Sequence, residues 1–364
     1  MLSSLSVALL AASALAAGPF ASDGWPQPTP EMKPWVYNWW MGSAVDAAGL
    51  DYQCAELAAK GFGGFHVIPI YGAKDGFEKK TRKMLSPDWV EAWNLAARTA
   101  RKHGLGIDLT MGSGWCFGGP WVTAEDAASS GVRVKRPCPG GEGPMIDPFS
   151  PAAMSNHVAR FEALFGKGGT ARRPRAFYHD SYEYYNAQPK DGRDPVESQL
   201  ACFKVWTDWC RANGYLSRNE AHGAPTNWLD LYALADIPET EMFGRECRDV
   251  LVSKFASSAA HVTGKRYVTS ESCTWVGQHF AEKLGDIKRL IDRLLLSGVN
   301  HMYYHGCCYS PTDVIWPGWC FYASVEMNPR NPVWRDAKFL NAYVARCQAM
   351  FQSATPDEDT LVYW

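Results

Sequence analysis

Short runs of apolar residues alternate along the chain with longer segments in which apolar residues recur every three or four positions. The short runs have the length of buried β-strands, and the longer segments have the period of helices packed along one face. Eight runs predict strands, at residues 35–40, 64–70, 105–110, 175–179, 215–219, 231–237, 266–270 and 300–305. Residues 118–147 are rich in turn-forming residues and predict an excursion from this alternation.

Helices are predicted between most of these strands, and some carry clear start and stop signals. Ser86 followed by Pro87 predicts a helix start, because serine caps the first turn and proline fits its first position. Gly61 predicts the end of the first helix. The predicted helices cover residues 46–60, 86–103, 151–165, the region around 202–209, 245–262, the region around 284–294, and 331–351.

Eight strands with intervening helices predict an α/β fold of the (β/α)8 TIM-barrel type, spanning residues 35–355. The helical spacers are weakest around the fifth and sixth strands. An open doubly wound sheet is the alternative. Its dinucleotide-binding version lacks support, because no G-x-G-x-x-G motif follows the first strand.

The N-terminal residues predict export. An apolar run of about a dozen residues ends in Ala14-Leu15-Ala16, which has the form of a signal-peptide cleavage site, although no Lys or Arg precedes the run. We therefore expect a signal peptide at 1–22, a Pro-rich lead at 23–34 and a secreted or periplasmic protein; a buried N-terminal helix is the alternative. The run is too short to cross a bilayer, and the sequence predicts no transmembrane segment.

The amino-acid composition excludes some classes of function and favours others. The 364 residues carry a formal net charge of −2, which argues against a nucleic-acid partner, since such proteins present basic surfaces. The chain has 16 Trp, 16 Tyr and 16 Phe, a surplus that suits either a Trp-rich core or a sugar-binding cleft. The 11 Cys residues cannot all pair with one another, and most lie in apolar segments, so we expect small buried side chains and assign no disulfide.

Polar residues gather where the predicted strands end, which is where barrel enzymes place their active sites. Two carboxyl groups beside aromatic walls suit glycoside hydrolysis, in which one carboxyl donates a proton and the other activates water or attacks carbon. Glu183 has aromatic neighbours in sequence and suits the acid, whereas Glu271 lies between two serines and suits the base. A salt bridge to a barrel arginine is the structural alternative for either carboxylate. The other residues expected at this rim are Asp180, Trp115, His222, Glu241, Trp275, His301 and His305 for substrate binding, with His179, Glu220, Glu239, Trp39 and Trp40 nearby.

Other chemistries have less support. The sequence contains neither H-E-x-x-H nor G-x-S-x-G, which weakens protease and esterase interpretations. A zinc site would require His179, Asp180, His222, His301 and His305 to converge, and their spacing matches no standard signature. A calcium ion held by carboxylates and carbonyls at the rim fits better.

These segments resemble glycoside hydrolase family 106, the α-L-rhamnosidases. The resemblance is carried by the runs at residues 34–41, 112–127, 179–183, 219–225, 235–244, 269–275, 300–311 and 316–334. It implies a (β/α)8 catalytic barrel, inversion at terminal α-L-rhamnosyl residues of plant or microbial polysaccharides, and a Ca²⁺ ion near the sugar. By motif it implies Glu183 as general acid, with Glu220 as rival, Glu271 as general base, and Glu241 as a carboxylate close to sugar or metal.

The chain departs from the family pattern at its end. Family members usually continue into β-rich domains, whereas residues 356–364 resemble only the start of a strand. Two alternatives therefore remain open at this point: a glycosidase of other sugar specificity, such as a galactosidase or a uronidase, and a non-catalytic carbohydrate-binding barrel.

Overall fold

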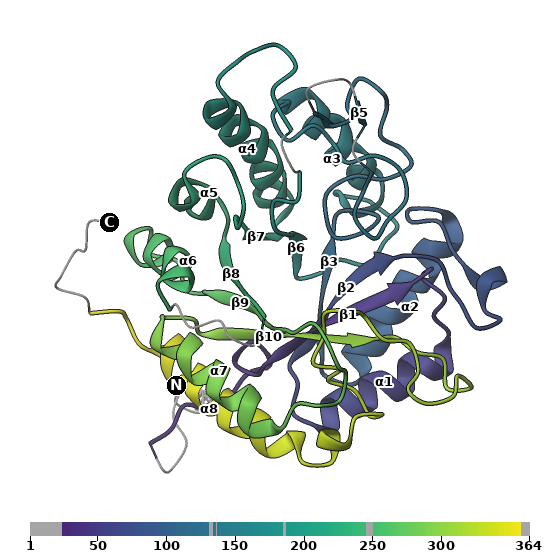
Figure 1. Ribbon diagram of the computed structural model, residues 1–364, viewed down its shortest axis with the longest axis vertical. Coiled ribbons are helices and arrows are strands. Elements are labelled where there is room, and N and C mark those ends of the chain that lie inside the picture. Colours follow the sequence, from purple (N-terminus) through teal and green to yellow (C-terminus); the bar gives the residue numbers. More distant parts are fainter. Residues whose placement is uncertain (1–23, 131–133, 136, 185–186, 245–249, 358–364) are drawn as a thin grey trace, which may run out of the picture.

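The computed structural model describes residues 24–130, 134–135, 137–184, 187–244 and 250–357. Eight parallel strands close into a barrel in the order β1-β10-β9-β8-β7-β6-β3-β2, with helices outside it (Figure 1). The predicted (β/α)8 TIM-type barrel is confirmed, and an open sheet is excluded. The strands are β1 (Trp35–Met41), β2 (Gly64–Ile70), β3 (Gly106–Thr110), β6 (Ala176–His179), β7 (Leu216–Glu220), β8 (Ile237–Phe243), β9 (Thr269–Thr274) and β10 (His301–Cys308).

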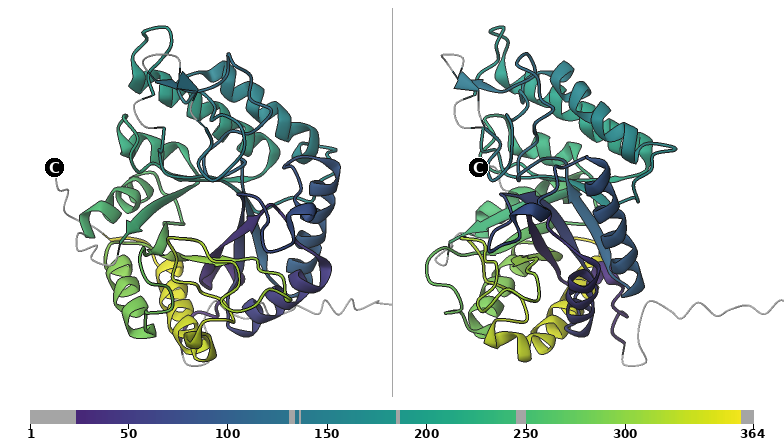
Figure 2. Two further views of the ribbon diagram at one scale, coloured as in Figure 1. Left: turned by 45° about the vertical axis from the view of Figure 1, so that its right-hand side comes forward. Right: turned by 90° about the vertical axis from the view of Figure 1, so that its right-hand side faces the viewer.

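The helices form the outer ring. They are α1 (Ala47–Ala59), α2 (Pro87–Lys102), α3 (Pro151–Phe165), α4 (Pro195–Asn213), α5 (Trp228–Leu234), α6 (Val250–Val262), α7 (Leu284–Leu296) and α8 (Ala337–Ser353), with short 3-10 turns η1 (Pro30–Met32), η2 (Glu78–Lys80) and η3 (Pro332–Arg335). Ser86, Ser150 and Asp194 each cap a helix that begins with proline, as predicted for Ser86. Figure 2 shows α8, in yellow, beside α7, in light green. The Asn341 amide of α8 donates to the Lys60 carbonyl after α1 at 2.9 Å and so closes the ring.

Successive side chains along a strand face opposite sides of the sheet, so the apolar residues of the barrel strands fall into two separate clusters. On β1, Val36 and Trp40 face outward and pack in the large core between sheet and helices. Trp35, Tyr37 and Trp39 face the barrel interior, where they form a second cluster with residues of other strands. The barrel interior is therefore lined by aromatic rings together with polar groups.

Trp35 fills the amino-terminal end of the barrel. Its ring lies over Gly64 and Gly106 on the next two strands, and a Cβ atom at these glycines would approach the ring to 2.7 and 2.3 Å. The guanidinium of Arg175 lies 4.1 Å from the ring centre on another side. Glycine at both positions is what gives this large side chain its space.

The sixth and seventh strands lie further along the chain than predicted. The predicted strand 231–237 is wrong, because α5 occupies residues 228–234 and β8 begins at Ile237. The Asn227 side chain accepts from the backbone of Leu229 and caps α5, and a short apolar run does not by itself distinguish helix from strand. β9 begins at Thr269 rather than at residue 266. Glu239, Glu241 and Glu271 consequently lie within strands, not after them.

The excursion predicted at 118–147 lies between β3 and α3. It contains a two-stranded antiparallel ribbon, β4 (Ser129–Ser130) with β5 (Val134–Lys135). The predicted signal peptide and most of the strand expected at 356–364 fall outside the described residues. Within the described residues, no helix has the length and apolar character needed to cross a membrane.

The cysteines behave as predicted where the structure describes them. Ten are unpaired, eight of these are buried, and Cys320 and Cys347 are partly covered; Cys247 lies outside the described residues. They act as small apolar side chains of the core.

Candidate active site

A cleft opens at the carboxyl end of the barrel strands. Its walls come from β1, β2, β8, β9 and β10, from the loops that follow β3 and β6, and from the long segment after β10. The lining residues are Trp39, Ile68, Trp115, Asp180, Ser181, Glu183, Glu241, Phe243, Glu271, Thr274, His305, Phe321, Tyr322 and Ala323. This is the end of the barrel at which the sequence placed the candidate site.

Four carboxyl groups lie on four neighbouring strands at the base of this cleft. Asp180 follows β6, Glu220 ends β7, Glu241 lies in β8 and Glu271 lies in β9. Glu241 and Glu271 are register partners across β8 and β9. Oxygen atoms of Asp180, Glu220 and Glu271 lie within 4.8 Å of one another. We call Asp180, Glu220, Glu241 and Glu271 the carboxyl cluster.

Burial and mutual repulsion shift the pKa values in the carboxyl cluster. Burial raises the pKa of Asp180 well above its usual range, and the charges of Glu183 and Glu241 raise it further. The pKa values of Glu220 and Glu271 are raised in the same way, first by burial and then by the other carboxylates. Removing carboxylates from water and placing them side by side disfavours ionisation of them all, so the cluster retains protons unless a cation compensates its charge.

Two neighbours orient the Glu271 carboxyl. The Thr274 hydroxyl donates to its Oε1 at 2.5 Å, and the His305 Nε2 lies 3.6 Å from the same oxygen. The other ring nitrogen of His305, Nδ1, lies 2.5 Å from the Ala323 carbonyl and therefore carries the proton of a neutral ring. Burial lowers the pKa of His305 to about 3, so its Nε2 faces Glu271 as an acceptor.

A layer of hydrogen bonds beneath the cleft supports Glu220. The Tyr178 hydroxyl donates to Glu220 Oε2 at 2.8 Å and lies 2.8 Å from the Tyr37 hydroxyl. Tyr37 reaches Glu239 Oε1 at 2.5 Å, and Thr269 donates to the other oxygen of Glu239 at 2.5 Å. Residues of β1, β6, β8 and β9 thus form a hydrogen-bonded layer beneath Glu220 and the rest of the carboxyl cluster.

Arg218 is the buried cation of this layer. Its Nε lies 3.3 Å from Glu239 Oε2, and its guanidinium lies 4.2 Å from the ring centre of Tyr178 and 3.8 Å from that of Tyr303. One terminal nitrogen lies 2.6 Å from His66 Nδ1, which accepts because a guanidinium only donates. His66 is accordingly neutral, and burial together with the Arg218 charge lowers its pKa well below the usual range.

Aromatic rings form the outer walls of the cleft. Phe321 stacks on Trp39 at 4.2 Å between ring centres, and Tyr71 lies above Phe321 at 6.3 Å. At the mouth, Phe243 and Tyr322 remain 52% and 56% exposed despite their large rings. Exposed rings at the entrance of a cleft offer flat apolar surfaces to a ligand.

The structure brings together most of the residues predicted from sequence. Glu183, Glu271, Asp180, Trp115, Glu241 and His305 all line the cleft. His222 lies at its edge, with Nε2 3.7 Å from Glu241 Oε2. The two serines beside Glu271 do not contact its carboxyl group: their hydroxyls donate to backbone carbonyls, so the polar surroundings expected from them come from Thr274 instead.

Besides His179, whose ring packs against Phe117 outside the barrel, three predicted rim residues lie elsewhere. His301 begins β10 at the opposite end of the barrel, where its ring lies 5.7 Å from that of Trp35. Trp40 faces the helices rather than the cleft, because it is one residue out of phase with Trp39. Trp275 is buried behind the segment after β10, and its carbonyl accepts from the Ser324 backbone.

Sequence reasoning missed the layer beneath the cleft and the aromatic segment after β10. Arg218 and Glu220 alternate along β7 as Glu239 and Glu241 do along β8, so each pair points into the barrel. Charged residues at every second position of a strand were the available signal. Phe321 and Tyr322 carried no such signal, because they lie in a loop.

The carboxyl cluster offers ligands for a hard cation. Asp180, Glu220 and Glu271 supply oxygen atoms, the donors that Ca²⁺ prefers, and Glu220 Oε1 is buried without a hydrogen-bond donor in the described part of the chain. These three residues form the closest group of oxygen donors among the described residues, and the role of Glu241 as a metal ligand stays a prediction. The histidines expected around zinc do not converge: His301 is at the far end, and His179 packs against Phe117 outside the barrel.

Comparison with known proteins assigns this chain to a family of glycoside hydrolases. The sequence model of glycoside hydrolase family 106, described as alpha-L-rhamnosidase, matches residues 26–192 and 209–364. A protein of Formosa agariphila named putative beta-glucuronidase is 29% identical over 210 residues, which cover 56% of this chain and 18% of that protein.

Solved structures agree on the fold. The structure of a rhamnosidase from Novosphingobium sp. PP1Y aligns with a TM-score of 0.74 at 12% identity, over 90% of this chain and 60% of that one. An endo-beta-1,4-mannanase from Thermotoga petrophila aligns with a TM-score of 0.55 at 9% identity, over 86% of this chain and 76% of the other. At these identities the likeness shows a shared barrel. The chain spans only part of the length of the relatives that it matches.

Proposed function

The chain belongs to glycoside hydrolase family 106, and from that premise we propose that it hydrolyses terminal α-L-rhamnosyl bonds of oligo- or polysaccharides with inversion at the anomeric carbon. One observation carries the proposal: carboxyl groups from neighbouring strands face an aromatic-walled cleft at the carboxyl end of the barrel. Glycoside hydrolysis needs such groups, one as a proton donor and one as an acceptor.

The charge of the cleft favours a neutral sugar. Among its described lining residues there is neither Lys nor Arg, whereas Asp180, Glu183, Glu241 and Glu271 are all acidic. A uronate would bring a further carboxylate beside these acidic groups with no Lys or Arg side chain among the described lining residues to pair with it, which costs free energy. The site therefore supports rhamnose, a neutral deoxy sugar, over the glucuronate in the name of the Formosa relative.

Glu183 is the proposed general acid. It lies on the loop after β6, half-buried, on the same cleft as the exposed rings of Phe243 and Tyr322. In this proposal the terminal sugar lies in the deeper part of the cleft and the leaving group lies at its mouth. Glu183 would there protonate the glycosidic oxygen as the bond breaks.

Glu271 is the proposed general base. It must be ionised to take a proton from water, while burial and its acidic neighbours favour the protonated form. The Thr274 hydroxyl lowers the pKa of Glu271, because it donates a hydrogen bond to the ionised carboxylate. A cation near Asp180 and Glu220 would also favour ionisation, because it neutralises charge that acts on Glu271.

We propose Ca²⁺ as that cation, held by the oxygen atoms of Asp180 and Glu220 beside Glu271. When bound, it would supply positive charge to the cluster and oxygen-preferring coordination positions for sugar hydroxyls. Export also remains a proposal, resting on the N-terminal sequence alone.

The Glu183 assignment predicts a dependence on the leaving group. Glu183→Gln should lower turnover of alkyl α-L-rhamnosides about a hundredfold or more, because a poor leaving group needs its proton. A dinitrophenyl rhamnoside, which departs without protonation, should lose much less. Steady-state rates on both substrates test this, with NMR of the first-formed anomer reporting inversion.

Glu91→Gln is the matched control, since Glu91 is exposed on α2. Equal losses on both substrates would contradict the acid role of Glu183. Wild-type protein that binds the sugar without hydrolysing any aryl glycoside would instead support a non-catalytic barrel, and turnover of another glycoside alone would support a different specificity.

The cluster predicts a pH-dependent response to calcium. The folded-state pKa values of Asp180, Glu220 and Glu271 are raised above their unfolded values, so their contribution to stability is present at low pH and declines as pH rises above about 4. Ca²⁺ should therefore raise the melting temperature at pH 7, by the equivalent of about 2.7 kcal/mol at a hundred times its Kd, and have little effect at pH 4.

Differential scanning fluorimetry with CaCl₂ or EGTA measures this response. The double variant D180N/E220Q should melt higher than wild type in EGTA at pH 7 and should not respond to Ca²⁺. A calcium response of equal size at both pH values, or one retained in the double variant, would place the ion elsewhere.

A further inference from the structure

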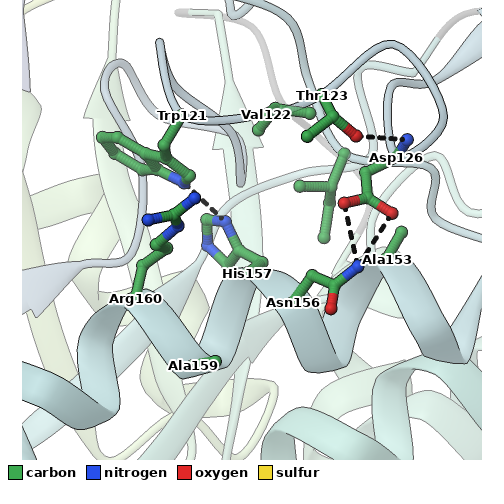
Figure 3. Close-up of a pocket in the computed structure, with 10 residues that line it drawn as sticks. Trp121, Val122, Thr123, Asp126, Ala153, Asn156, His157, Ala159 and Arg160 are labelled. Carbon is green, nitrogen blue, oxygen red and sulfur yellow. Dashed lines mark hydrogen bonds between the residues drawn. The ribbon is translucent and has the colours of Figure 1, made fainter.

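A larger hollow lies outside the catalytic cleft, between residues 121–126 and helix α3 (Figure 3). Its volume is about 320 Å³, which falls in the range of small-molecule sites. Trp121, Asp126, Asn156, His157 and Arg160 supply its aromatic and polar groups. The hollow and the catalytic cleft share none of their lining residues.

The hollow has a fixed aromatic wall. The Trp121 indole nitrogen donates to His157 Nδ1 at 3.2 Å, and His157 Nε2 donates to the Met111 carbonyl at 2.7 Å. Burial lowers the pKa of His157 to about 4, so the ring is neutral and both of its nitrogens are bonded. Trp121 is only half-buried. Its ring is therefore held in place and still offers surface to a ligand.

A polar pair stands at the other side of the hollow. Both carboxylate oxygens of Asp126 accept from the Asn156 amide, at 3.2 and 3.0 Å, and the Asp126 backbone donates to Thr123 Oγ1 at 3.3 Å. Each carboxylate oxygen keeps accepting capacity, and the Asn156 carbonyl oxygen is unused among the described contacts. The pair can accept hydrogen bonds from hydroxyl groups while its own geometry stays fixed.

Arg160 supplies unused donors. It is exposed, and within the described ranges its guanidinium makes neither a hydrogen bond nor an ion pair. Figure 3 shows it extending from α3 toward Trp121, on the side away from Asp126. Asn156, which holds Asp126, lies one helical turn earlier, about 6 Å along the axis. The donors of Arg160 therefore lie beside Trp121, and the acceptors of Asp126 lie at the other side of the hollow.

We propose that this hollow is a second saccharide site that binds a sugar carrying a carboxylate, such as a uronic acid residue. The sugar ring packs on Trp121, its hydroxyls donate to Asp126, and its carboxylate pairs with Arg160 in the two-point geometry that guanidinium groups favour. A neutral sugar would leave the guanidinium unpaired. The charge preference is opposite to that of the catalytic cleft, which fits a glycan containing both neutral and acidic residues.

Titration of the full chain with sodium D-glucuronate and with D-glucose, followed by saturation-transfer NMR, tests the site directly. We expect glucuronate to bind at least ten times more tightly than glucose, and Arg160→Met to reduce its affinity to that of glucose. Arg98→Met is the matched control, because Arg98 is also exposed on a barrel helix, α2, and should leave binding unchanged. Added NaCl should weaken glucuronate binding.

Equal affinities for the two sugars in wild type would overturn the proposal, as would glucuronate binding that survives Arg160→Met. Turnover of an uncharged aryl rhamnoside should be the same in Arg160→Met and wild type. A protein without hydrolase activity that still binds glucuronate through Arg160 would refute the proposed function and leave this site standing.

Discussion

Glu271→Gln should lower the turnover of aryl α-L-rhamnosides by about a hundredfold to ten-thousandfold, whatever the leaving group. Glutamine keeps the size of the side chain and can still accept from Thr274, but it cannot take a proton from water. Loss of the base slows attack on the anomeric carbon, a step that protonating the leaving group does not replace. Rates on dinitrophenyl and alkyl rhamnosides, compared with those of Glu183→Gln, separate the two roles.

The melting temperature of Glu271→Gln has to be measured beside its rate. Removing one ionisable group from the carboxyl cluster relieves repulsion, so the variant should be at least as stable as wild type at pH 7. An inactive variant that is also unfolded would reveal nothing about the base. A folded variant that hydrolyses rhamnosides at nearly the wild-type rate would refute the assignment.

Arg218→Met should lower the free energy of unfolding by about 3–5 kcal/mol, the usual cost of leaving one partner of a buried ion pair uncompensated. Methionine fills much of the arginine volume, so the loss comes chiefly from charge and hydrogen bonding. Glu239 loses its cation and His66 loses the donor to its Nδ1. Urea denaturation followed by tryptophan fluorescence measures the change.

The double variant R218M/E239Q tests the cause. If the uncompensated Glu239 charge dominates, the double variant should recover a substantial part of the stability lost by Arg218→Met alone. If the two losses simply add, the stabilising role of Arg218 lies instead in its contacts with the rings of Tyr178 and Tyr303.

The fold was predictable because hydrophobic periodicity reports on it directly. The strand 64–70 and the helix 151–165 have the predicted bounds. The helix buries its apolar face in the large core, whereas the strand is buried on both sides, with Ile68 and Ile70 in the barrel interior. The strand predicted at 231–237 was wrong because a helix of seven residues is too short to show a helical period of apolar residues. The remaining sequence signal for a helix there was Asn227, whose side chain caps its first turn.

The cleft residues were predictable where chemistry and strand ends coincide, as at Asp180, which directly follows β6. The position of a residue within its strand was harder to predict from the sequence, because a difference of a few residues moves a side chain from one end of the barrel to the other. His305 reaches the cleft, while His301 on the same strand lies beside Trp35 at the other end. Contacts such as Tyr178 with Glu220 join residues 42 positions apart, which no local pattern reveals.

The two glycines beside Trp35 bear on the order in which products depart. That ring closes the barrel toward its amino-terminal end, so the cleft opens toward the carboxyl end of the strands. In the proposed reaction, a terminal sugar bound against the carboxyl cluster would leave past the space that the leaving group occupies. We therefore expect the aglycone, or the shortened glycan, to dissociate first and the free monosaccharide last, so that the free sugar competes with incoming substrate.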